Sequence, residues 1–307
     1  MAPAPKIDLT SAILLMVLAI IWGGSFFLAA IALREMPPIT ITLFRVVLAL
    51  PALALFIWIK GVALPRSLTI WGAYLVMGAL NNAIPFSLIF WSQTQITSGL
   101  ASILNGATSI TGVIVAGLLL GDERLSARKL TGVIIGFSGV ALTIGPDALR
   151  SFDIRSLAQL AVLLAGLSYS LAGVWAKLRL AGQSSEMNAL GMLLGSSVLM
   201  IPTALWMDGL PSFNLMMSTW SALLALSVLC TSVPYLLYFK ILRRAGSGNL
   251  MLVTLLIPPV AIGLGITFLG EPLQAAALVG FAVIALGLAV VDGRLWELLH
   301  PRRRSTR

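Results

Sequence analysis

The chain has 307 residues, of which 59% are hydrophobic and 10% are charged, and its formal net charge is +9. A soluble domain carries about 25% charged residues, so this composition excludes a water-soluble globular protein. The single Cys excludes an intrachain disulfide, and with a single His it offers no thiol or imidazole cluster for a metal. We predict no cofactor and no metal site.

Apolar runs recur along the whole chain, and Gly, Pro and charged residues separate them. Each run is close to the length of about 20 residues that crosses the hydrocarbon core of a bilayer as a helix. The runs predict an all-α membrane protein with ten transmembrane helices. In chain order, these cover residues 9–33, 39–59, 69–91, 95–119, 129–146, 157–176, 187–206, 219–239, 248–269 and 273–292.

The distribution of positive charge supports this count. With a cytoplasmic N-terminus, 16 of the 20 Lys and Arg residues fall on the cytoplasmic side, and three, Arg34, Arg150 and Arg155, fall in outer loops. Membrane proteins carry such an excess on the cytoplasmic side, so we predict an inner-membrane protein with both termini in the cytoplasm. The basic tail, residues 294–307, is expected to contact anionic membrane lipids and not nucleic acid.

One sequence pattern, Glu-x-Leu-x6-Gly-x6-Gly, occurs twice with a constant offset of 148 residues. The two copies are Glu123, Leu125, Gly132 and Gly139, then Glu271, Leu273, Gly280 and Gly287. An offset of about half the chain indicates a duplicated unit. Five spans per unit is an odd number, so the second unit is predicted to cross the membrane in the opposite orientation, as in inverted-repeat transporters.

The predicted organisation is therefore two inverted five-helix repeats. The first covers residues 1–146 and the second residues 157–293, with a connecting loop at 147–156 and the basic tail after them. In transporters built this way, the substrate binds near the midplane of the bilayer between the two repeats.

Several motifs resemble the drug/metabolite transporter superfamily, in its EamA family of ten-helix metabolite exporters. They are Trp22-Gly23-Gly24-Ser25-Phe26, Phe44-Arg45, the two Glu-x-Leu units, and Pro258-Pro259 ahead of Leu-Gly-Glu. The resemblance covers nearly the whole chain and is greatest to amino-acid exporters of the YddG kind. The first repeat departs from the pattern, since Asn105-Gly106-Ala107 stands where a proline is expected.

Polar side chains in the middle of spans are candidate substrate contacts, because in lipid a polar group needs a partner, water or cargo. The first span offers Trp22 and Ser25, and the third offers Asn81 and Asn82 followed by Pro85. Pro85 has no N–H and frees a carbonyl one turn earlier. The alternatives are close helix packing for Ser25 and hydrogen bonds between helices for the amides.

The fourth span carries Ser102, Asn105 and Thr108 on one polar face. Such a face predicts a pathway lining, with hydrogen bonding between helices as the alternative. Tyr169 in the sixth span offers aromatic surface to an amphipathic cargo.

The eighth span carries polar residues at the same membrane depth as the third span. Thr231 and Ser232 precede Pro234 and Tyr235, as the two amides precede Pro85. The two repeats therefore predict matching polar surfaces that both face the substrate.

Few charged groups accompany these residues. Arg45 is the only charge inside a span, and we predict that it reaches the outer headgroups or holds neighbouring carbonyls, with attraction of a carboxylate as the alternative. Glu123 and Glu271 lie in short turns and are expected to cap the helices that follow them, with gating as the alternative. Pro258 is assigned a structural role.

These features favour a transporter over a membrane enzyme, which would need a nucleophile–base pair, a carboxylate dyad or a metal motif, and over a channel, which would need selectivity rings. We predict export of a small metabolite, aromatic or neutral amino acids first, without an obligate protein partner. Mid-membrane carboxylates and His are the usual proton relays, so their absence from the spans predicts uniport or exchange. Proton-coupled antiport of drugs or other metabolites is the alternative.

Overall fold

The computed structural model describes residues 9–121, 126–144, 154–235, 237, 253–272 and 274–292, and every regular element in these residues is a helix. The all-helical class is therefore confirmed. Glu123 and Leu125, Leu273, most of the connecting loop and the basic tail lie outside the described residues.

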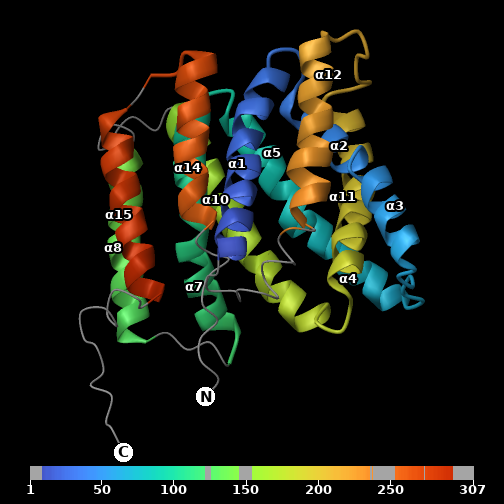
Figure 1. The fold of residues 1–307 in the computed structure, drawn as a ribbon, viewed down its shortest axis with the longest axis horizontal. Coiled ribbons are helices and arrows are strands. Elements are labelled where there is room, and N and C mark those ends of the chain that lie inside the picture. The colour runs from blue at the N-terminus through green and yellow to red at the C-terminus, as the bar shows by residue number, and fades with distance from the viewer. Residues whose placement is uncertain are drawn as a thin grey trace, which may run out of the picture.

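Figure 1 shows the arrangement of the described helices. In chain order they are α1 (Leu9–Ala32), α2 (Pro38–Val47), α3 (Leu50–Lys60), α4 (Leu68–Gly78), η1 (Ala79–Ala83), α5 (Ile84–Ser92), α6 (Ser98–Gly106), α7 (Thr108–Leu119), α8 (Ala127–Ile144), α10 (Ile154–Arg179), α11 (Ser185–Met207), α12 (Met217–Leu224), η2 (Ala225–Ser232), α14 (Val253–Leu264), η3 (Gly265–Leu269) and α15 (Ala275–Asp292). The three η elements are π-helices.

Eight helical segments in the described part of the chain are long and apolar enough to cross a membrane. They are Ala12–Ala32, Pro38–Lys60, Leu68–Ser92, Ser98–Leu119, Ala127–Ile144, Ile154–Arg179, Ser185–Met207 and Met217–Tyr235. Two shorter apolar helices, Leu256–Leu269 and Ala275–Val291, lie at the predicted ninth and tenth spans. The outward side chains of the long segments are apolar, as Ile134, Leu164 and Val198 show at 65%, 56% and 63% exposure, which suits a surface covered by lipid.

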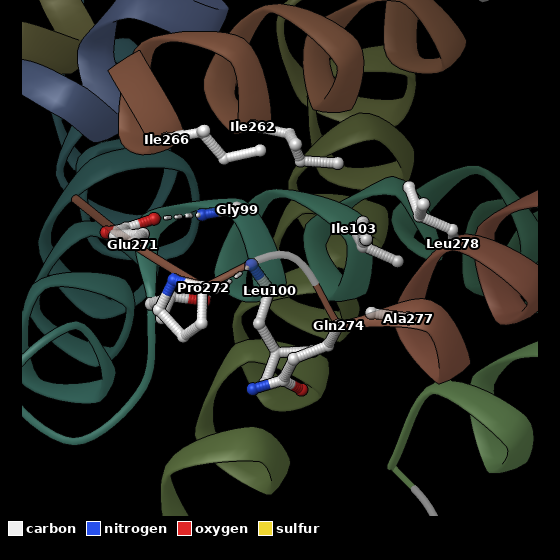
Figure 2. A pocket seen from close by; sticks show the side chains of 11 residues that line it. Gly99, Leu100, Ile103, Ile262, Ile266, Glu271, Pro272, Gln274, Ala277 and Leu278 are labelled. Atoms are coloured by element: carbon white, nitrogen blue, oxygen red, sulfur yellow. Dashed lines mark hydrogen bonds between the residues drawn. The ribbon is translucent and has the colours of Figure 1, made fainter. Parts of the chain in front are cut away.

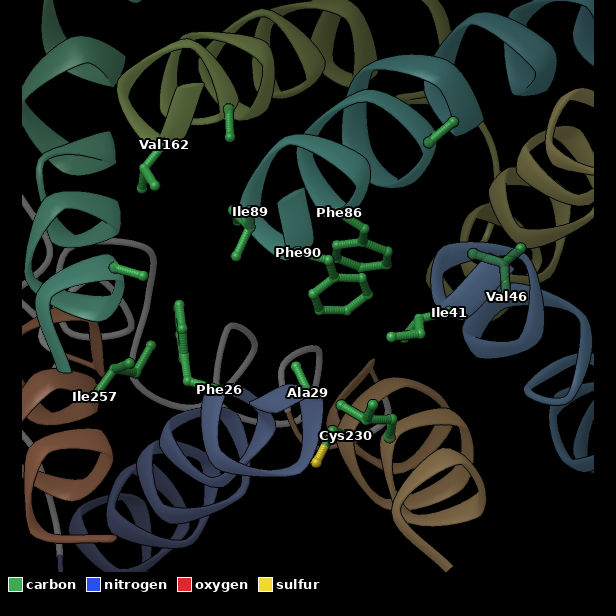
Figure 3. Packing of buried hydrophobic residues seen from close by; sticks show 14 of the residues in the cluster. Phe26, Ala29, Ile41, Val46, Phe86, Ile89, Phe90, Val162, Cys230 and Ile257 are labelled. Atoms are coloured by element: carbon green, nitrogen blue, oxygen red, sulfur yellow. The ribbon is translucent and has the colours of Figure 1, made fainter. Parts of the chain in front are cut away.

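The main helix contacts join the two predicted repeats. α1 packs on α14, α4 on α11, and α10 on α5 and α7. The largest buried cluster of apolar side chains lies between them, and Figure 3 shows Phe86 and Phe90 of α5 with Ile41 of α2, Phe26 of α1 and Ile257 of α14. The core of the molecule is thus an interface between the first and second halves of the sequence.

α8 and α15 form the tightest of these contacts, here called the glycine seam (Figure 1). A Cβ on Gly139 would lie 2.6 Å from the backbone nitrogen of Ile284 and 2.8 Å from the carbonyl oxygen of Gly280. A Cβ on Gly287 would lie 2.7 Å from the carbonyl oxygen of Gly132. Gly132 therefore faces Gly287 and Gly139 faces Gly280, which makes the two helices antiparallel. The four glycines of the duplicated motif meet each other.

Candidate substrate site

Two spans are interrupted at equivalent places by π-helix followed by proline. η1 ends two residues before Pro85, and η2 ends two residues before Pro234. At each end the backbone N–H just before the proline bonds five residues back, Ile84 to Ala79 and Val233 to Val228. The proline itself offers no N–H to continue the ladder, so carbonyl groups before it are left for other partners.

Side chains of the opposite half take up these carbonyl groups. The Ser168 hydroxyl of α10 donates to the Leu80 carbonyl oxygen at 2.7 Å, and Arg45 Nη2 of α2 donates to the Cys230 carbonyl oxygen at 3.3 Å. The sequence predicted that Pro85 frees a carbonyl group one turn earlier. Sequence reasoning did not identify Ser168 as the partner of that carbonyl. A serine near the middle of a span was the available signal.

The amide pair of η1 lies at the centre of a polar group that joins both halves. Asn82 is fully buried, and its Nδ2 donates to the Ser196 hydroxyl of α11 at 3.2 Å. The Tyr235 hydroxyl donates to Asn82 Oδ1 at 3.1 Å, and Asn81 Nδ2 lies 3.4 Å from that hydroxyl. Asn81 also approaches Met192 Sδ at 3.5 Å. Asn81 and Tyr235 stay partly exposed, whereas Asn82 is fully buried.

Arg45 is buried with 6% of its surface exposed. Its Nε donates to Thr231 Oγ1 at 3.0 Å, and its Cζ lies 3.8 Å from the centroid of the Phe86 ring. The prediction that this side chain reaches the outer headgroups is wrong, because α2 turns it onto η2 and α5. The prediction that it holds a neighbouring carbonyl is correct. We call Arg45, Asn81, Asn82, Thr231 and Tyr235 the central cluster.

Other predicted contacts use their hydroxyl groups within the protein. Ser25 Oγ donates to the Trp22 carbonyl oxygen at 2.6 Å, and Ser102 Oγ donates to the Gly99 carbonyl oxygen at 2.7 Å. Ser232 Oγ bonds the Ala49 carbonyl oxygen at 2.9 Å. The Ser25 and Ser102 bonds stay within their own helices, and only the Ser232 bond joins two segments that are distant in the sequence.

The polar residues of the fourth span differ in their hydrogen bonding. Thr108 Oγ1 donates to the Asn105 carbonyl oxygen at 2.6 Å, whereas Asn105 Oδ1 is buried without a hydrogen-bond partner in the described residues. Trp22 and Tyr169 are partly buried and pack against the main apolar cluster.

Glu271 caps a helix, but not the one that follows it. Its carboxylate accepts from the Ser98 backbone N–H at 2.8 Å and the Ser98 hydroxyl at 2.9 Å, at the start of α6. It also accepts from the Gly99 N–H at 3.3 Å (Figure 2). The expected cap on α15 is therefore wrong, because η3 and the left-handed Gly270, with φ of 67°, turn the carboxylate back toward the other half. Pro258 lies within α14.

Two further carboxylates at the same end of the molecule make equivalent contacts across the halves. Asp208 Oδ2 accepts from the Thr40 N–H and the Thr40 hydroxyl, both at 2.8 Å, at the start of α2. Glu35 accepts from the Met216 N–H at 3.0 Å and from Thr219 at the start of α12. Carboxylates at helix N-termini are stabilising. We call Glu35, Asp208 and Glu271 the carboxylate end; sequence reasoning missed its first two members.

The cavities at the carboxylate end differ in size. The one beside Glu271, lined by Ile103 and Ile266 (Figure 2), has a volume of about 20 Å³, enough for about one water molecule. The one lined by Glu35, Thr40 and Asp208 has about 210 Å³. Both lie beside carboxylates that bond the other half, and neither is lined by a residue of the central cluster.

The model of the EamA-like transporter family matches residues 9–145 and 156–291. The chain therefore belongs to this family and is a multi-pass membrane transporter, which confirms the resemblance seen in the sequence.

Individual relatives agree with the family. The chain is 28% identical to an uncharacterized transporter of Archaeoglobus fulgidus, over 80% of this chain and 84% of that one. It is 24% identical to a probable amino-acid metabolite efflux pump of Escherichia coli, over 93% and 96%. One solved crystal structure superimposes with a TM-score of 0.66 at 19% identity, covering 95% of this chain and 99% of the other, which shows a shared fold.

Proposed function

We propose that the protein exports small neutral or zwitterionic metabolites, aromatic and neutral amino acids first, and that the central cluster binds them. The observation that carries this proposal is the position of Asn81 and Tyr235, which are partly exposed, belong to opposite halves and lie 3.4 Å apart in polar contact. Amides and hydroxyl groups suit the ammonium and carboxylate of an amino acid, and the neighbouring aromatic rings suit its side chain. The name of the Escherichia coli relative points to the same substrate class.

Alternating access of two inverted five-helix repeats is the proposed mechanism, with ten membrane helices and both termini in the cytoplasm of an inner-membrane protein. The antiparallel glycine seam supports the inversion, because the equivalent helices of the two repeats run in opposite directions there. Reporter tags test the topology directly. Tags that place residues 60–68 and 207–218 in one compartment would contradict it.

We further propose uniport or exchange without built-in proton coupling. Among the buried residues of the described chain, no Asp, Glu, Lys or His occurs, and such groups are the usual intramembrane proton relays. Proton-coupled antiport is the second candidate. Flux of radiolabelled amino acids from proteoliposomes, with and without a pH gradient, decides between them: strict dependence on the gradient would contradict uniport, and flux of another solute class alone would contradict amino-acid export.

A further inference from the structure

Arg45 is the one charged side chain that is buried in the described part of the chain. It lies in α2, within the candidate span Pro38–Lys60, so its burial places a cation inside the membrane region. An arginine remains protonated at physiological pH. A buried charge without a counter-ion costs several kcal/mol, and a cost of this size calls for an explanation.

The partners of Arg45 among the described residues are all neutral. Thr231 accepts from Nε, the Cys230 carbonyl oxygen accepts from Nη2, and the Phe86 ring lies against the guanidinium. A guanidinium has five N–H donors, and the two hydrogen bonds occupy two of them. Three donors of a buried cation are therefore without a protein acceptor in this part of the structure.

A purely structural role does not require the charge. Thr231 Oγ1 already donates to the Leu226 carbonyl oxygen at 2.8 Å within η2, and a neutral amide could bond the carbonyl that Pro234 leaves free. The planar, charged fork of arginine is instead suited to bidentate contact with a carboxylate or phosphate. A phosphate carries up to two charges and calls for more than one cation, whereas a carboxylate carries one and matches a single arginine.

We propose that Arg45 is the carboxylate-binding residue of the transport site, and that Asn81 and Tyr235 contact the rest of the cargo's polar group. This inference rests on the proposed function for its location but not for its chemistry: it requires that the cargo carries a carboxylate, whether or not it also carries an amine. The Phe86 contact fixes one face of the guanidinium, so that the free N–H donors point in a defined direction.

The test compares acids with their amides. Apparent Kd values are measured from ligand-induced shifts in Tm of the purified full-length protein in detergent, at about pH 6 so that the amino groups stay protonated. The ligands are phenylalanine and leucine with their amides, and 3-phenylpropionate with its amide. Wild-type protein is expected to prefer each acid that it binds over the amide by about tenfold to a hundredfold, the range of charge-assisted hydrogen bonds.

Arg45→Gln is expected to reduce this preference to about one, while the exposed Arg34→Gln retains it. Arg45→Lys keeps the charge but not the planar guanidinium, and it should retain an intermediate preference for the acid. This variant tests the proposal if Arg45→Gln does not fold. Equal binding of acid and amide by wild-type protein, or an unchanged preference in the Arg45 variants, would overturn the proposal. A preference confined to 3-phenylpropionate would overturn amino-acid export and leave the role of Arg45 intact.

Discussion

Where α8 packs on α15, the two halves touch through glycine backbones, whereas at the central cluster they touch through the side chains of interrupted helices. The seam has no room for a Cβ at Gly139 or Gly287. The cluster has polar groups held only by long contacts, such as Asn81, whose three contacts lie between 3.3 and 3.5 Å. The seam therefore suits a fixed joint, whereas the central cluster suits a site that rearranges around cargo.

Gly139→Leu tests the fixed joint and has the largest expected effect. Its side chain would meet the backbone of Ile284 and Gly280, and a clash with backbone cannot be relieved by a rotamer change, so we expect destabilisation of about 3 kcal/mol or more and loss of folded protein. Fluorescence-detected size-exclusion chromatography measures the folded fraction. Gly173→Leu, at a position with nothing within 4 Å of a Cβ, is the matched control, and equal yields for both would contradict a tight seam.

Asn81→Ala tests the site that rearranges. The partly exposed amide makes only long contacts, so we expect amino-acid flux in proteoliposomes to fall by about tenfold, while Tm changes by only a few degrees. Asn82→Ala should behave in the opposite way, because the fully buried Asn82 bonds Ser196 and Tyr235 and its loss leaves buried groups unpaired. A larger loss of flux in Asn82→Ala than in Asn81→Ala, with the larger fall in Tm in Asn81→Ala, would place the cargo contact at Asn82.

Glu271→Gln tests whether the contacts of the carboxylate end hold the two halves together there, independently of the glycine seam. Losing the charge weakens three hydrogen bonds to the start of α6 by about 1–2 kcal/mol in total, which should raise the accessibility of a nearby position several-fold. Maleimide labelling of Ile103→Cys, with Cys230 replaced by Ala, measures it. Ile103 is 1% exposed beside Glu271; an unchanged labelling rate would argue against a gating contact.

Ser168→Ala should have the smallest effect. It removes the donor to the Leu80 carbonyl oxygen and is expected to cost about 1 kcal/mol of stability. Pro85→Ala supplies a backbone N–H close to that carbonyl, so the double variant should recover part of the loss. Thermal unfolding of the two single variants and the double variant measures the coupling. Strictly additive effects would show that proline and serine do not share this carbonyl.

The sequence determined the class of the protein. Its few charges, recurrent apolar runs and duplicated Glu-x-Leu-x6-Gly-x6-Gly pattern led to an all-helical membrane transporter, because lipid admits only helices or closed barrels. The same logic selected Asn81, Asn82, Thr231 and Tyr235, since polar groups at membrane depth need partners. Asn81, Asn82 and Tyr235 do lie together, and η1 and η2 interrupt the helices beside the two prolines that the sequence singled out.

The tertiary structure decided what these residues contact. Glycines 148 residues apart were visible as a repeat, but their meeting across the seam depends on helix packing. Arg45 was expected to reach the headgroups or to hold neighbouring carbonyls, and only the turn of α2 onto η2 buries it against Thr231 and the Cys230 carbonyl. Glu271 was expected to cap its own helix and instead holds α6. Helix type and membrane depth depend on the local sequence. The partners of Arg45 and Glu271 lie in segments more than 150 residues away, and a single sequence does not show which distant segments pack together.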